Sequence, residues 1–110
     1  MAGGVRFLGW MVVASVSLSA AQGRDLKAFF QRACAQCHGT DGSARGPGGQ
    51  RLGGRVLNSA SWQARMPSER LAKSIRTGKN TMPSFEAQLT EAEALRLVEE
   101  VIRPLAVARK

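Results

Sequence analysis

The stretch Cys34-Ala35-Gln36-Cys37-His38 decides the fold of this chain, because it holds both cysteines and the only histidine among 110 residues. Two cysteines at this spacing, followed directly by a histidine, are typical of a c-type haem attachment site. The thiols form thioether bonds to the two vinyl groups of one porphyrin, and the imidazole then lies beneath the iron as its proximal axial ligand. The stretch therefore predicts one covalent haem c, with iron bound by His38.

Two other kinds of site use cysteines at this spacing. A redox-active dithiol of the thioredoxin type needs a surrounding βαβ unit, and the chain has no convincing run of alternating apolar residues to supply its strands. A structural zinc site needs a fourth nitrogen, sulfur or carboxylate ligand, usually from a second Cys/His pair, and the chain has no further cysteine or histidine. Both alternatives are less well supported than a haem.

A second motif lies downstream, in residues 75–85, which read IRTGKNTMPSF. Together with the Cys-x-x-Cys-His stretch it resembles the bacterial class I c-type cytochromes, over residues 26–105. In that family a methionine followed by proline, just before the last helix, is the sixth iron ligand, so the resemblance implies this role for Met82. Met66 is also followed by a proline and is the alternative. Met82 is favoured because it lies between two predicted helices, where a loop can fold over the open haem face.

The resemblance also implies roles for three further residues. Gly46-Pro47 matches a family pair whose proline carbonyl accepts a hydrogen bond from the proximal histidine, which would orient His38 and strengthen it as a donor to iron. A glycine-proline pair is also a plain turn former. Leu52 is expected to pack on the haem. Trp62 is expected either to donate its indole N–H to a haem propionate or to serve only as core.

The remaining pattern predicts an all-α domain, with three to four helices wrapped around the haem. The first helix is expected to begin after Asp25 as its N-cap and to run into the Cys34 region. Residues 39–54 are too rich in glycine to form the interior of a helix or strand, and they are expected to wrap closely round a haem edge. A further helix is expected over residues 68–76, with Gly78 as its stop.

The last helix has the clearest signals in the sequence. Thr90 and Glu93 form a capping box at its start, and Pro104 is expected to end it near Arg103.

The family often has a glycine on the first helix and an aromatic on the last where the two cross, and this chain has Leu26 and Val101 there. The crossing is expected to be present but repacked. With four Phe, two Trp and no Tyr the chain has few residues for a core, and a covalently held haem would supply the missing apolar volume.

The N-terminal segment is predicted to be a signal peptide over residues 1–21, followed by one haem domain over residues 22–110. It has Arg6, then an apolar run of about a dozen residues and small residues before the cleavage site. This run is short for a membrane span, which needs about twenty residues; an uncleaved anchor is the alternative. Export to the periplasm fits the site of haem attachment in the family that the chain resembles.

The charge balance points to protein partners. The formal net charge is +8, of which Arg6 lies in the predicted signal peptide, so the mature chain is at +7. The positive residues are scattered and no nucleic-acid motif accompanies them, so redox partners with acidic docking faces are expected, and neither nucleic acid nor stable membrane insertion.

The expected function is one-electron transfer by a monomeric carrier, without enzymatic activity. The alternative is a dedicated cytochrome subunit of a periplasmic oxidoreductase that acts, for example, on a sulfur compound or an alcohol. A third possibility is a haem enzyme or gas sensor with an open sixth position. The Met82-Pro83 pair argues against it.

Overall fold

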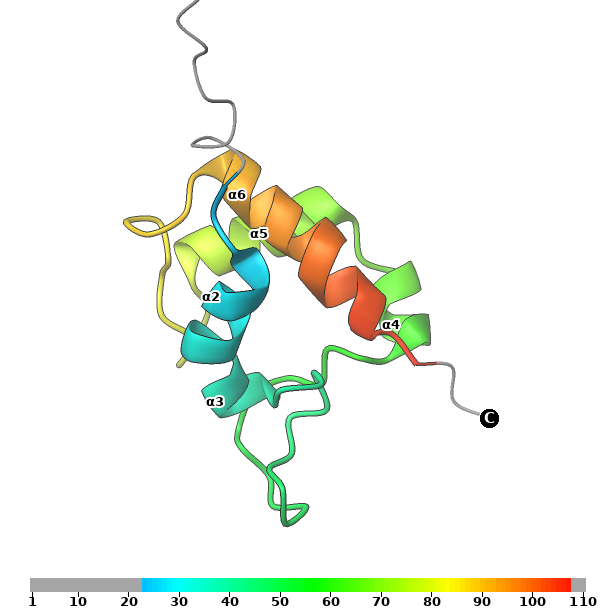
Figure 1. Ribbon diagram of the computed structural model, residues 1–110. Helices are drawn as coiled ribbons and strands as arrows, with labels where there is room; N and C mark the ends of the chain where they lie inside the picture. The colour runs from blue at the N-terminus through cyan, green and yellow to red at the C-terminus, as the bar shows by residue number, and fades with distance from the viewer. Residues whose placement is uncertain (1–22, 108–110) are drawn as a thin grey trace, which may run out of the picture.

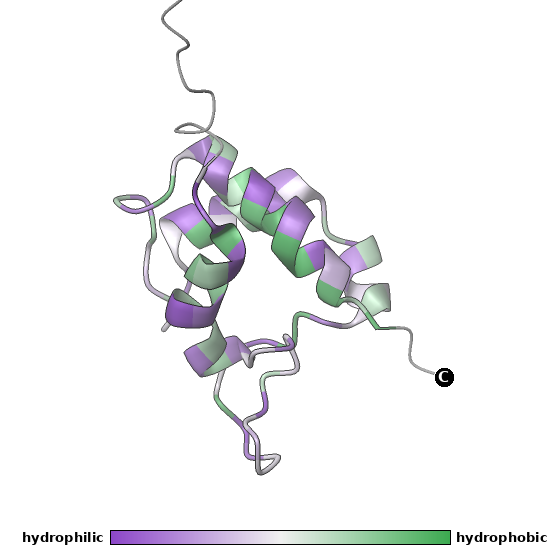
Figure 2. Cartoon of the chain, viewed as in Figure 1, coloured by the Kyte–Doolittle hydropathy of each residue, from purple (hydrophilic) through white to green (hydrophobic). Residues whose placement is uncertain are grey.

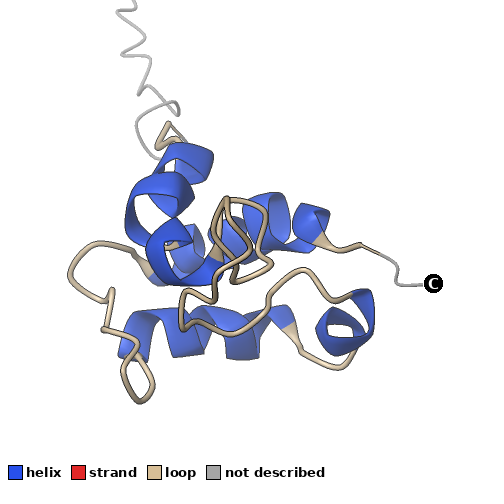
Figure 3. Ribbon diagram, turned by 90° about the horizontal axis from the view of Figure 1, so that it is seen from below, coloured by secondary structure: helices blue, strands red, loops and turns tan. Residues whose placement is uncertain are grey.

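The computed structural model describes residues 23–107, which form helices joined by loops (Figure 1). The predicted signal peptide lies outside the described residues. Figure 3 shows that this part of the chain contains no strand; its extended pairing is limited to isolated bridges. The prediction of an all-α fold is confirmed. The helices are α2 (Leu26–Ala33), α3 (Ala35–His38), α4 (Ala60–Ala64), α5 (Ser68–Thr77) and α6 (Glu91–Leu97), continued by η1 (Val98–Ile102) and η2 (Arg103–Leu105).

Helix α2 begins where the sequence predicts. The carboxylate of Asp25 accepts a hydrogen bond from the backbone N–H of Ala28 at 3.0 Å, and so caps the first turn. Residues at helical spacing bury one face: Phe30 is 1% exposed, and Phe29 packs edge-to-face on Phe85 with ring centroids 5.8 Å apart. This apolar face holds the start of the chain against the later helices.

Helix α5 ends at Gly78, as predicted. The φ angle of Gly78 is +78°, and its N–H donates to the carbonyl of Ser74 at 2.8 Å. A positive φ at this position favours glycine, which has no Cβ to clash with the backbone. On the same helix Leu71 and Ile75 are both buried, so they share an inward face.

Helix α6 has the predicted capping box. The Thr90 hydroxyl accepts from the N–H of Glu93 at 3.1 Å, and the Glu93 carboxylate accepts from the N–H of Thr90 at 3.0 Å. Both bonds satisfy backbone donors that have no partner within the helix. The start of the last helix is therefore encoded locally.

The last helix ends near Arg103, as predicted. Helix α6 continues as the π-helical η1, whose C-cap is Arg103, and the single 3₁₀ turn η2 follows to Leu105. Pro104 has no N–H, and its ring would clash with the carbonyl four residues earlier. The preceding turn is widened, and the N–H of Arg103 donates to the carbonyl of Val98, five residues back.

The helices pack around one apolar core. Helix α5 lies against α6, and α2 contacts both α6 and η1, so the first and last helices cross (Figure 1). Leu26 is buried in the core cluster and Val101 is partly buried against it. Figure 2 shows hydrophobic residues recurring along α2 and along α6 with η1, among hydrophilic ones. The long segment 39–59 leaves this core below α3 and returns to it at α4 (Figure 1).

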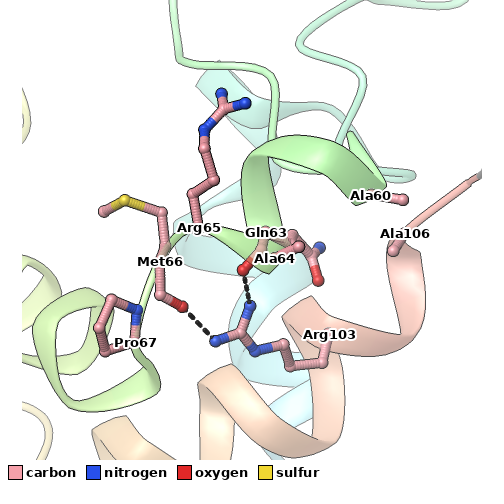
Figure 4. Close-up of a pocket in the computed structure, with 8 residues that line it drawn as sticks. All are labelled: Ala60, Gln63, Ala64, Arg65, Met66, Pro67, Arg103 and Ala106. Carbon is pink, nitrogen blue, oxygen red and sulfur yellow. Dashed lines mark hydrogen bonds between the residues drawn. The ribbon is translucent and has the colours of Figure 1, made fainter.

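Arg103 joins the last helix to the segment between α4 and α5. Its guanidinium donates to the carbonyls of Gln63 and Met66 (Figure 4) and to the hydroxyl of Ser68. The Gln63 carbonyl also accepts from the N–H of Met66 at 3.1 Å, so the chain after α4 is bonded both to itself and to the last helix. One side chain thus holds the segment that carries Met66.

Candidate functional site

The two cysteines and the histidine lie within one turn of chain. Cys34 stands between α2 and α3, and Cys37 and His38 are the last two residues of α3. The N–H groups of Cys37 and His38 both donate to the carbonyl of Cys34, at 3.2 and 3.0 Å. Cys34 is buried, Cys37 is exposed, and His38 is half-buried. This turn presents two unpaired thiols and an imidazole together.

The surroundings of Cys34 do not suit a structural zinc site, which usually needs four ligands. Among residues 23–107, no group of three or more His, Cys, Asp or Glu side chains is placed to hold a metal ion. Burial raises the pKa of the Cys34 thiol from 9.0 to about 11, which also disfavours a reactive thiolate of the dithiol type.

The orientation of His38 is set by a backbone carbonyl. The Nδ1 atom of its imidazole lies 2.8 Å from the carbonyl oxygen of Arg55. Because a carbonyl can only accept, the proton is on Nδ1 and the lone pair on Nε2 is available to a metal. Such a bond also makes the imidazole a stronger donor.

The partner of this bond corrects the expectation for Pro47. The loop closes on itself around Pro47: the N–H of Gly46 donates to the carbonyl of Gln50 at 2.8 Å, and the N–H of Gly49 to that of Gly46 at 2.9 Å. Pro47 is therefore an exposed turn residue. It is the later segment around Arg55 that passes His38.

Gly54 explains why that segment can come so close. Its N–H donates to the carbonyl of Cys37 at 2.8 Å, and a Cβ atom placed on it would lie 2.3 Å from that carbonyl oxygen and 2.9 Å from His38 Nδ1. Only a residue without a side chain fits this approach. Sequence reasoning did not single out Gly54 or Arg55, although the glycine-rich stretch indicated a close passage of the backbone.

The earlier part of the loop is also tied to His38. The N–H of Ala44 donates to the His38 carbonyl at 2.7 Å, and the N–H of Leu52 donates to the Ala44 carbonyl at 2.9 Å. Leu52 is half-buried at this position. Its packing on a haem stays a prediction.

Trp62 lies beside the segment that holds His38. The guanidinium carbon of Arg55 lies 5.4 Å from the centroid of the Trp62 ring, and Trp62 itself packs against the core. Both residues line a hollow of about 450 Å³, together with Gly53, Gly54, Val56 and Ser59. The two expected roles of Trp62, propionate donor and core residue, both stay predictions.

The two candidate methionines occupy different surroundings. Met82 lies in the loop after α5 and closes a tight turn, in which its N–H and carbonyl both bond to Lys79, at 2.9 and 3.1 Å. Met66 lies between α4 and α5, where its carbonyl accepts from Arg103 and its thioether points away from that arginine (Figure 4). Both are half-buried against the core. The choice of Met82 as iron ligand stays a prediction.

The residues of this site fit a covalently attached haem. Two thiols stand one turn apart, the imidazole of His38 has its Nδ1 bonded to the Arg55 carbonyl and so leaves Nε2 for a metal, and the half-buried Trp62 beside Arg55 adds apolar surface. When bound, the haem supplies an iron that exchanges one electron between its ferric and ferrous states.

Comparison with known proteins decides the family. Residues 21–99 match the model of the family described as cytochrome c oxidase, cbb3-type, subunit III. The chain belongs to this family of c-type cytochromes. It is also similar to the solved KustC0563 c-type cytochrome, with 33% identity and a TM-score of 0.64 over 76% of this chain and all of that one. A mutant of Kustc0563 gives 35% identity and a TM-score of 0.61 over 74% and 99% of the two chains. No curated protein matches.

The predictions of fold, family and cofactor are thereby confirmed. The protein is a monohaem c-type cytochrome with covalent haem c, and it carries out haem-based electron transfer. Within residues 23–107, no helix of this cytochrome is long and apolar enough to cross a membrane.

Proposed function

We propose that this c-type cytochrome carries single electrons between redox partners in the periplasm, with His38 and Met82 as axial ligands and no substrate chemistry of its own. The observation that carries the proposal is the hydrogen bond from His38 Nδ1 to the Arg55 carbonyl, because it leaves Nε2 as the ring nitrogen that can bind iron. With a methionine on the opposite side, both axial positions are filled. Electron transfer then needs little rearrangement, and no open position is left for a substrate.

The segment around the site supplies charge for docking. Between residues 39 and 68, Asp41 is the sole carboxylate, against Arg45, Arg51, Arg55 and Arg65. All five side chains are exposed. A surface of this sign attracts partners with acidic docking faces and speeds their encounter, an effect that salt weakens.

The absorption spectrum of the haem-loaded protein tests the ligand set. We expect a low-spin spectrum with the sulfur-to-iron charge-transfer band, lost in Met82→Ala and retained in Met66→Ala. Loss in Met66→Ala alone would reverse the ligand choice. A high-spin wild-type protein that binds external ligands freely would instead indicate a catalytic or sensing haem.

A second candidate function is that of a dedicated subunit of a periplasmic oxidoreductase. The matched family model favours it, because its description names an oxidase subunit. The two functions differ in how long the protein stays bound to a partner. A stable stoichiometric complex at about 0.15 M salt would support the subunit, whereas rapid exchange that slows as salt rises would support the carrier.

Arg51 offers a direct test of docking, since its exposed side chain belongs to the basic segment 39–68. We expect Arg51→Gln to lower the rate of electron exchange with an acidic partner at low salt. Lys27→Gln is the matched control, because Lys27 is an exposed cation on α2, outside this segment. Equal effects of both substitutions would show that net charge, rather than this surface, governs the encounter.

A further inference from the structure

Arg55 makes two contacts at once. Its carbonyl oxygen lies 2.8 Å from His38 Nδ1, and its guanidinium lies over the Trp62 ring, 5.4 Å from the centroid. The first contact uses the backbone and the second uses the side chain. The residue therefore links the ring of His38 to α4.

Trp62 is a firm support for such a link. Its ring packs against the core, and its backbone N–H donates to the hydroxyl of Ser59, the N-cap of α4, at 3.3 Å. Tryptophan is the aromatic residue that attracts a cation most strongly. The position of the Arg55 side chain is thus tied to the core.

The backbone on either side of Arg55 is held at two points. The N–H of Gly54 donates to the carbonyl of Cys37, and the N–H of Leu57 donates to that of Gly42 at 2.7 Å. Between them lie Arg55 and Val56, and Val56 is exposed. Gly53, with a φ of +100°, precedes them and allows wide backbone rotation. Besides its carbonyl bond to His38, Arg55 contacts the core through its stack on Trp62.

We infer that Arg55 is a positioning residue for the iron ligand: its stack on Trp62 keeps its carbonyl bonded to His38 Nδ1. The bond then holds the imidazole in one orientation and maintains its strength as a donor. The inference rests on the proposed role of His38 as axial ligand. It assigns to the Arg55 side chain a function that is separate from docking.

The test is a double-mutant cycle on the haem-loaded protein, read by NMR in the diamagnetic ferrous state. Arg55→Gln, Trp62→Leu and the double variant are compared for the exchange rate of the His38 Nδ1 proton. We expect each single variant to speed exchange about two- to fivefold, as for a surface cation–π contact, and the double variant no further. Arg55→Lys, which keeps the cation, is expected to fall between wild type and Arg55→Gln.

Two controls separate positioning from general effects. Arg65→Gln removes the same charge from another exposed arginine and is expected to leave the Nδ1 exchange unchanged. The backbone amide of Ala94, which is fully buried in α6, reports on global opening and is expected to be unaffected by Arg55→Gln. The Arg55 side chain is exposed, so Arg55→Gln is expected to fold. This variant therefore tests the inference even if Trp62→Leu does not fold.

The outcomes are distinct. The inference would be overturned if Arg55→Gln left the exchange rate of the His38 Nδ1 proton unchanged. It would also be overturned if the effects of the two single variants added in the double variant. In either case the proposed carrier function would stand, provided that the protein keeps its low-spin spectrum. A wild-type spectrum without histidine ligation would overturn both this inference and the proposed function.

Discussion

Gly54 lies directly against the backbone of Cys37, so close that the carbonyl oxygen of Cys37 occupies the space a side chain would need. The same glycine donates its N–H to that carbonyl. This contact brings the chain past the haem motif and leads it to Arg55, whose carbonyl meets His38. The orientation of His38, the proposed iron ligand, therefore depends on a residue with no side chain, sixteen positions further along.

A methyl group at Gly54 should disturb the site. In Gly54→Ala the new Cβ would lie 2.3 Å from a backbone atom, which cannot move aside as a side chain can. We expect a loss of about 1–3 kcal/mol in the free energy of unfolding and a lower yield of haem-loaded protein. Gly48→Ala is the control, because its Cβ would meet only the flexible end of Gln50. Equal stability of the two variants in denaturant would contradict the close approach.

Arg103 should contribute strongly to stability. Its guanidinium serves the carbonyls of Gln63 and Met66 and the hydroxyl of Ser68, and hydrogen bonds to a charged donor each contribute about 1.5–3 kcal/mol. We expect Arg103→Met to lower the unfolding free energy by at least about 2 kcal/mol, measured by denaturant titration. Arg70→Met, at an exposed arginine of α5, should change it by less than about 0.5 kcal/mol. Similar losses in both variants would show that the bonds of Arg103 contribute little.

The stability of the protein should depend on the side-chain amide of the buried Gln63. Its Nε2 donates to the carbonyls of Leu57 and Ile102, at 2.7 and 2.9 Å, and so joins the end of the haem loop to the last helix. Gln63→Leu keeps similar bulk but removes both of these buried hydrogen bonds, which should lower the unfolding free energy by about 2–4 kcal/mol. Gln88→Leu, at an exposed glutamine, is the control. A neutral Gln63→Leu would mean that water or other donors replace the amide.

The capping box should make the free energy of unfolding depend on pH. The N–H of Thr90, with a smaller contribution from Arg24, lowers the pKa of the Glu93 carboxyl below its ordinary 4.5. The stabilisation is therefore present above pH 4.5 and lost as the pH falls through the lower folded value. We expect the unfolding free energy of the wild type to fall more steeply below pH 4.5 than that of Glu93→Gln. Other carboxylates, such as Asp41, are common to both proteins, so parallel curves would refute the assignment to Glu93.

Local signals in the sequence were sufficient for the starts of α2 and α6 and for the end of α5. Asp25, Thr90 with Glu93, and Gly78 mark these helix ends through contacts within four residues, and all three were predicted. Helix α4 was not predicted, because it has only five residues and little apolar periodicity. The end of the last helix near Arg103 was predicted from Pro104, but the π turn before it was not.

The sequence by itself indicated a covalently bound haem c, because that attachment needs two thiols and an imidazole at fixed spacing within five residues, and it predicted Cys34, Cys37 and His38 as the residues that hold the haem. It also determined the all-α class, through helical periodicity and caps. Only the tertiary structure decided which carbonyl orients His38. That choice depends on a backbone approach across sixteen residues, permitted by Gly54 and supported by Trp62, and a carbonyl has no residue-specific signature in a sequence.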